Sequence, residues 1–138
     1  MSLKDKSEEN KDLAYALCDM EHYNAAANRF YYSCYQKLYQ LAVDKMQYKV
    51  QYKAKKKKGS HEALIEHVDE TINLLLMDQK KALKLMRTKN IKGVYYNLKS
   101  YRVRADYKDD NISKADVEDM KKKIEEFEDY FNIIKETI

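Results

Sequence analysis

The chain has 138 residues, no proline, two glycines and no tryptophan, and 36% of its residues are charged. β-Sandwiches and barrels need many turn residues, so these counts exclude the turn-rich all-β classes. The apolar class reaches 44% and includes 13 tyrosines, which excludes an intrinsically disordered chain. The net charge of +4 comes mostly from lysine, and we expect most of the lysines to form a solvated surface.

Apolar residues recur every three or four positions along the chain, the spacing of amphipathic helices. The pattern over residues 13–20 predicts a short first helix that ends near His22. The polar residues 1–10 before it are expected to be disordered. A long second helix is predicted from Asn24 to about Lys57, with two adjacent apolar stripes. So wide an apolar arc predicts a central helix, or one shared between the core and a partner.

A third helix is predicted over residues 61–77, after the break at Gly59, with a kinked continuation towards Met86. The pattern weakens over residues 90–93 and resumes over 94–105, which predicts a fourth helix. The last helix is expected from about Ser113 to the end of the chain. Ser113 and Asp116 have the spacing of a capping box at its start.

These elements predict an all-α fold, an antiparallel up-and-down bundle of four to five helices in one domain over residues 1–138. The first ten residues are polar, so no secretory leader is expected. The longest run of leucine, isoleucine, valine and methionine, residues 74–77, is far too short to span a membrane. Cys18 and Cys34 lie inside apolar patterns, which predicts buried, reduced thiols. We therefore expect a cytoplasmic protein with no membrane partner.

Metal and cofactor motifs do not occur. His22, His61 and His67 lack the three- or four-residue spacing that places two ligands on one helix face. Glycine-rich phosphate loops are missing as well. We expect no metal and no cofactor.

Lysines crowd residues 53–58, with Tyr48 and Tyr52 just before them. Such a basic, aromatic helix end can contact phosphates and stack on bases. The alternative is a solvated C-terminal turn whose positive charges suit the helix dipole. Acidic residues dominate after residue 109, so the molecule is bipolar, which favours self-association or a charged partner.

The most specific stretch is YRVRADY, residues 101–107. Arg102 and Asp106 are four residues apart, and an ordinary surface ion pair is one interpretation. The other is a functional cluster in which Arg102 and Arg104 bind phosphate through planar guanidinium groups. In that cluster Asp106 orients the arginine and Tyr107 donates a hydrogen bond.

Two segments, taken in order, resemble the HEPN family, the higher-eukaryote and prokaryote nucleotide-binding domains. YNAAANRFYYSCY, residues 23–35, is similar to that family's second helix, roughly Y-x-x-A-x-x-R-x-Y-Y-x-x-[FY]. R-x-x-A-D-Y, residues 102–107, resembles the end of small stand-alone members, and residues 59–61 fit the same subgroup. The order and spacing cover the chain from about Leu13 to its end.

The resemblance implies a homodimeric helical bundle. Many relatives are metal-independent ribonucleases, often toxins paired with a minimal nucleotidyltransferase antitoxin or components of antiviral defence. Their motif is an arginine followed after four to six residues by a histidine, with two copies meeting across the dimer. Here Tyr107 follows Arg102 in place of the histidine, and tyrosine has an ordinary pKa near 10.

We therefore expect an RNA- or nucleotide-binding protein, with ribonuclease activity as one version of that function. The alternative is a non-catalytic helical module for dimerisation or regulation. The residues expected to act are Arg102 and Tyr107 in catalysis; Arg29, Arg102 and Arg104 in phosphate or nucleic-acid binding; and Tyr31, Tyr32, Tyr35, His61 and Asp106 in lining the cleft.

Overall fold

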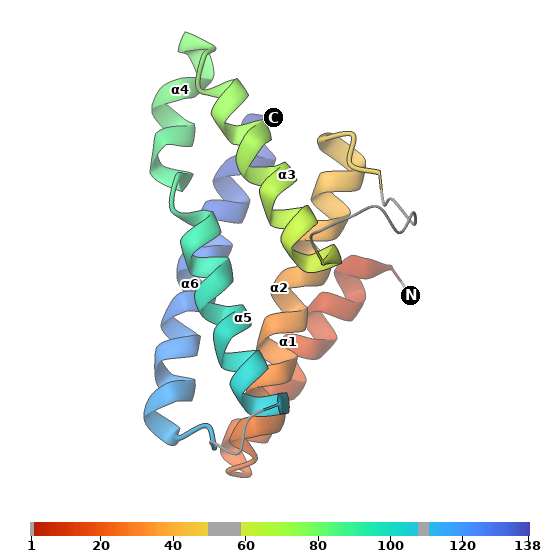
Figure 1. Cartoon of the computed structure of the whole chain (residues 1–138), viewed down its shortest axis with the longest axis vertical. Helices are drawn as coiled ribbons and strands as arrows, with labels where there is room; N and C mark the ends of the chain where they lie inside the picture. The colour runs from red at the N-terminus through yellow and green to blue at the C-terminus, as the bar shows by residue number, and fades with distance from the viewer. Residues whose placement is uncertain (1, 50–58, 108–110) are drawn as a thin grey trace.

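A computed structural model describes residues 2–49, 59–107 and 111–138 (Figure 1). These residues form six α-helices and one short 3₁₀ helix, and they contain no strand. The elements are α1 (Leu3–Asp19), α2 (Tyr23–Lys45), α3 (Ser60–Leu75), α4 (Gln79–Leu85), η1 (Met86–Thr88), α5 (Ile91–Tyr107) and α6 (Lys114–Thr137). The all-α helical bundle that the apolar spacing predicts is confirmed.

Helix α2 is the centre of the bundle. It packs against α1, α3, α5 and α6, as its wide apolar arc predicts. Helices α1 and α2 form one antiparallel pair and α5 and α6 another, and both pairs turn at the same end of the molecule (Figure 1). The largest fully buried side chains are Tyr31, Tyr95, Phe30, Phe127, Leu38, Leu64, Ile65, Ile72, Leu85, Ile91, Leu98 and Met120.

Helix α1 begins earlier than the sequence predicts. We expected residues 1–10 to be disordered, but residues 3–10 form the first turns of α1. The Ser2 side chain accepts a hydrogen bond from the backbone of Asp5, in a capping box. The Ser7 hydroxyl is buried and donates to the backbone oxygen of Ser33 at 2.7 Å, which fixes α1 to α2. One local and one tertiary hydrogen bond therefore hold residues 3–10, a segment in which Leu3 is the one apolar residue.

Helix α2 ends at Lys45, so the prediction that it continues to Lys57 is wrong. The next residues turn back on the helix, with Met46 buried and Gln47 at a positive φ of 55°. The His67 ring on α3 donates from Nε2 to the Met46 backbone oxygen at 2.7 Å. Tyr48 lies beyond the helix, with its ring centroid 5.1 Å from that of His67. The lysine run at residues 53–58, with Tyr52, lies outside the described residues.

Helix α3 ends and a separate helix begins at the position where the sequence predicted a kinked continuation of one helix. Asp78 accepts a hydrogen bond from the backbone of Lys80 at 2.9 Å and so begins a separate helix, α4. Helix α5 begins at Ile91, earlier than expected. The capping box of Ser113 and Asp116 at the start of α6 is confirmed.

The two thiols are free and buried, as their apolar context predicts. Cys34 on α2 is 3% exposed and Cys18 on α1 is 8% exposed. Burial raises the pKa of both thiols. In the described parts of the chain, every helix is too short or too polar to cross a membrane.

Candidate functional site

Arg102 lies on the face of α5 that packs against α2, enclosed by aromatic rings. Its guanidinium carbon is 5.7 Å from the ring centroid of Tyr31, 5.3 Å from that of Tyr32 and 5.5 Å from that of Tyr107. Its Nη2 donates to the Tyr32 hydroxyl at 3.0 Å. The side chain is only 14% exposed. Cation–π contacts of this kind are strongest where the cation has lost its water.

The charge of Arg102 is balanced by Asp106, one turn further along α5. Nε of Arg102 lies 3.1 Å from Oδ2 of Asp106. Even so, Nε is buried and has no hydrogen-bond partner in the described residues, because its N–H does not point at the carboxylate. Asn28 on α2 donates to the same carboxylate oxygen at 3.0 Å. The ion pair is therefore close but not aligned, and the carboxylate is held from α2.

His61, in the first turn of α3, adjoins the same tyrosines. Its ring stacks on Tyr35, with centroids 4.2 Å apart, and its Nδ1 forms a short hydrogen bond with the Tyr31 hydroxyl. Its edge-on contact with Tyr32 has a centroid distance of 5.9 Å. Burial, the charge of Arg102 and that of Lys99 lower the pKa of His61 to about 4. The imidazole is therefore neutral at pH 7.

Tyr95 on α5 completes a buried hydrogen-bond chain that sequence reasoning missed. The hydroxyls of Tyr31 and Tyr95 are 2.7 Å apart, and the Tyr95 hydroxyl also lies 3.4 Å from the backbone oxygen of His61. Burial raises the pKa of both phenols, so both stay protonated at neutral pH. The spacing of Ile91, Tyr95 and Leu98 on one helix face is the signal that could have identified Tyr95 as buried.

Most of the residues that the sequence singled out come together here. The aromatic arginine cluster, as we call it below, consists of Tyr31, Tyr32, Tyr35, His61, Arg102, Asp106 and Tyr107. Tyr31 departs from expectation in one respect, because it is fully buried and cannot line an open cleft. Tyr107 is 70% exposed and covers Arg102 with its ring.

The other two arginines expected at phosphate lie elsewhere. Arg104 points to α6, where its Nη2 is 3.3 Å from Oδ2 of Asp116 and its guanidinium lies over the Tyr101 ring. Arg29 faces α1, and its Nη1 donates to Asn10 at 3.3 Å. Residues two apart on a helix point in different directions. Arg102 and Arg104 therefore do not meet at one site.

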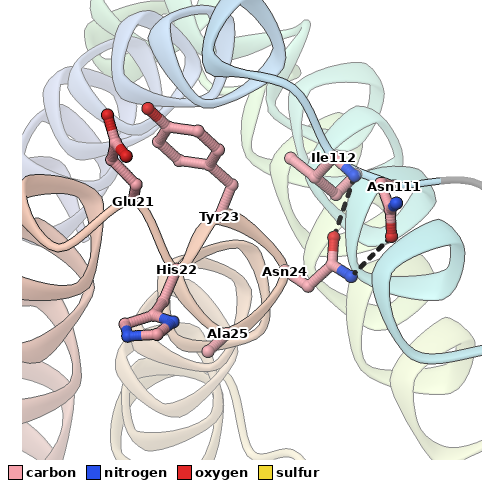
Figure 2. Close-up of a pocket in the computed structure, with 7 residues that line it drawn as sticks. All are labelled: Glu21, His22, Tyr23, Asn24, Ala25, Asn111 and Ile112. Atoms are coloured by element: carbon pink, nitrogen blue, oxygen red, sulfur yellow. Dashed lines mark hydrogen bonds between the residues drawn. The ribbon is translucent and has the colours of Figure 1, made fainter.

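A hollow of about 450 Å³ lies at the turn between α1 and α2, away from the cluster. Figure 2 shows Asn24 at its edge, accepting a hydrogen bond from the Ile112 backbone and donating to Asn111. Its side chain thus ties the start of α2 to the segment before α6. His22 points away from these contacts (Figure 2). In residues 2–49, 59–107 and 111–138, no group of three potential metal ligands comes together.

Comparison with protein-family models, with curated proteins and with solved structures gives no match. The class that the fold itself defines is an all-α helical bundle.

Proposed function

We propose that the chain binds RNA or a nucleotide in the manner the HEPN resemblance implies, with Arg102 as the phosphate contact. The observation that carries this proposal is the state of the Arg102 guanidinium. It is partly desolvated and held against three tyrosines, and it makes one hydrogen bond to the described residues. Nη donors of a fixed guanidinium fit phosphate oxygens bidentately.

The aromatic rings around Arg102 would contact the bases of bound RNA, beside the phosphate contact of Arg102. Tyr32, Tyr35 and His61 are partly exposed, and an unpaired base can stack on such rings. Base stacking needs no particular sequence, whereas the phosphate contact makes binding dependent on salt. We therefore expect single-stranded RNA to bind better than duplex RNA.

Cleavage is a further step of the same proposal. The 2′-oxygen would bond to the adjacent phosphorus as a base takes the hydroxyl proton, and the bond from phosphorus to the 5′-oxygen would break, with the leaving 5′-oxygen taking up a proton from water. Arg102 would stabilise the charge that develops on the phosphate oxygens. Tyr107 was expected to act there, but a phenol is a weak base near neutral pH. His61 adjoins the same rings, but its lowered pKa of about 4 makes it a weak proton acceptor as well, so binding is the stronger part of the proposal.

The biological setting belongs to the proposal as well. The HEPN resemblance implies a homodimer in the cytoplasm and a minimal nucleotidyltransferase as antitoxin. Co-purification of the native chain would identify a nucleotidyltransferase partner.

Binding is tested by fluorescence anisotropy with labelled single-stranded RNA at several salt concentrations. Arg102→Ala should weaken binding at least about tenfold and reduce the salt slope by about one. Lys122→Ala, an exposed charge on α6, is the matched control and should change little. Equal affinity of the Arg102→Ala variant and the natural chain would refute the assignment. Incubation of unlabelled RNA with both proteins measures cleavage separately.

A second candidate is a non-catalytic interaction module. The pairing of Arg102 with Asp106 and Tyr32 favours it, because the arginine already has internal partners. In that case Arg102 stabilises the contact between α2 and α5, and the chain has no salt-dependent affinity for RNA. The same anisotropy titration separates the two candidates.

A further inference from the structure

A second hollow, of about 440 Å³, lies between the first turns of α1, the last turns of α2 and the last turns of α6. Its lining residues fall within residues 4–8, 37–45 and 128–135, and none of them belongs to the aromatic arginine cluster. We refer to this hollow as the α1–α2–α6 groove. Small-molecule sites in proteins have volumes of roughly 300–1,000 Å³. The groove therefore has the size of a ligand site and uses none of the residues around Arg102.

Part of the groove is apolar. Leu41 on α2 and Phe131 on α6 line it, and they are 5% and 8% exposed. The ammonium group of Lys37 lies 5.3 Å from the centre of the Phe131 ring, and the Lys37 side chain is 16% exposed. A largely desolvated ammonium group attracts an anion more strongly than an exposed one, because its surroundings screen the charge less. An apolar group and a negative charge can therefore bind side by side in this groove.

Most of the negative charge that lines the groove is already paired. Four lysines and three acidic residues line it. The Glu8 carboxylate lies 3.4 Å from Lys37. The Glu128 carboxylate lies 2.7 Å from Lys11, a residue outside the lining. These two carboxylates therefore add little negative potential to the groove.

The remaining charges are mostly positive. In residues 2–49, 59–107 and 111–138, Lys4, Lys45 and Lys135 form no ion pair, and Asp44 is the acidic lining residue that forms none. All four side chains are exposed. The three lysines belong to α1, α2 and α6 respectively, so each helix that borders the groove contributes one of them. The groove therefore has an excess of two positive charges beside its apolar surface.

We propose that the α1–α2–α6 groove binds a small organic anion, in which a carboxylate or phosphate group is joined to an aliphatic or aromatic part. The apolar part lies on Leu41 and Phe131, and the anionic group contacts Lys37 and the unpaired lysines. An inorganic anion leaves the apolar surface in contact with water. An apolar cation meets repulsion from the lysines. The ligand therefore needs both parts.

This inference goes beyond the proposed function and rests on different residues. Arg102→Ala should weaken the binding of RNA and leave the binding of an organic anion in the groove unchanged. Each of the two proposals can therefore fail while the other holds.

Octanoate is the probe that tests the groove, in an NMR titration of the full chain labelled with ¹⁵N. The amide signals of Leu41 and Phe131 should shift, with a dissociation constant below about 1 mM. Octylamine has the same aliphatic chain with the opposite charge, and inorganic phosphate has the charge without the chain. Each should bind at these amides at least about tenfold more weakly than octanoate. Octyl phosphate should match octanoate, because the lysines recognise either anionic group.

Two exposed residues on α6 allow the groove to be changed without altering the core. Asn132→Trp places a large ring in the groove and should abolish the binding of octanoate. Lys135→Glu should weaken it at least about threefold, since it reverses one of the unpaired charges. Lys122→Glu, on the same helix but outside the lining, is the matched control and should change little. Urea denaturation of each variant checks that it is folded.

Three results would each overturn the proposal. The first is a chain whose Leu41 and Phe131 signals do not move at about 10 mM octanoate. The second is octylamine or inorganic phosphate binding as tightly as octanoate, because one part of the ligand would then be unnecessary. The third is a folded Asn132→Trp variant that binds octanoate like the natural chain, because the probe would then lie elsewhere.

Discussion

Asn28 and Asp106 join α2 to α5 through a hydrogen bond of 3.0 Å, at the carboxylate oxygen that also lies closest to Arg102. The carboxylate therefore has two partners and limits how far the guanidinium can turn outward. If Arg102 contacts phosphate, Asp106 opposes that contact electrostatically.

Replacing Asp106 should strengthen the binding of anions. Asp106→Asn keeps the size of the side chain and removes the negative charge 3.1 Å from Arg102. We expect the affinity for single-stranded RNA to rise several-fold, because the phosphate no longer competes with a carboxylate. The cost in unfolding free energy should be about 0.5 kcal/mol, as for a partly exposed pair one helical turn apart. Unchanged RNA affinity would contradict a phosphate role for Arg102.

The buried hydroxyl of Tyr95 should contribute measurably to stability. Tyr95→Phe removes the group that lies 2.7 Å from the Tyr31 hydroxyl and leaves the ring in place. We expect the unfolding free energy to fall by about 1 kcal/mol, measured by urea denaturation. Tyr96→Phe is the matched control, since that hydroxyl makes only a long contact of 3.5 Å with Glu66. Equal losses of unfolding free energy in the two variants would refute a stabilising hydrogen bond at the Tyr95 hydroxyl.

His61 should make stability depend on pH. Its folded-state pKa is about 4, below the ordinary value of 6.5, so below pH 6.5 the unfolded chain takes up a proton that the folded chain refuses. Stability therefore falls as the pH drops from about 6.5 to about 4. His61→Gln should remove this part of the dependence, whereas the exposed His22→Gln should retain it. Thermal unfolding of the three proteins across this range is the measurement.

Glu21 offers a site for stabilisation. It ends α1 with a positive φ of 62°, a conformation that glycine adopts without strain. The backbone of the next residue, His22, donates to the Leu17 oxygen at 2.9 Å and so closes the helix end. Glu21→Gly should raise the unfolding free energy by about 1 kcal/mol. Glu21→Ala loses the same charge but keeps the strained backbone, so it should not raise the unfolding free energy. Equal increases in the two variants would refute the argument.

Helical periodicity predicted α3, α5 and α6 because one buried stripe dominates each of them. The end of α2 was missed because His67, on another helix, supplies its cap at Met46. Periodicity continued past Lys45 in the sequence, and only a tertiary contact shows where the helix stops. Residues 3–10 were missed for a similar reason, since the buried group that holds them is the hydroxyl of Ser7.

The candidate site was predictable in its residues more than in its geometry. Arginine and tyrosine at the HEPN-like spacing identified Arg102, Tyr32 and Asp106. The sequence did not separate Arg104 from Arg102, although a spacing of two residues already places them on different faces. Tyr95 belongs to no sequence motif. Its hydrogen bond with Tyr31 depends on the distance between hydroxyls on two different helices, which the sequence does not give.

Because the Cys34 thiol is buried, its rate of alkylation measures how often the bundle opens. An alkylating reagent attacks the thiolate, and burial both shields this sulfur and raises its pKa. The sulfur can therefore react only during moments when α2 parts from its neighbours. The rate of labelling, compared with that of the unfolded chain, reports how often the centre of the native molecule opens.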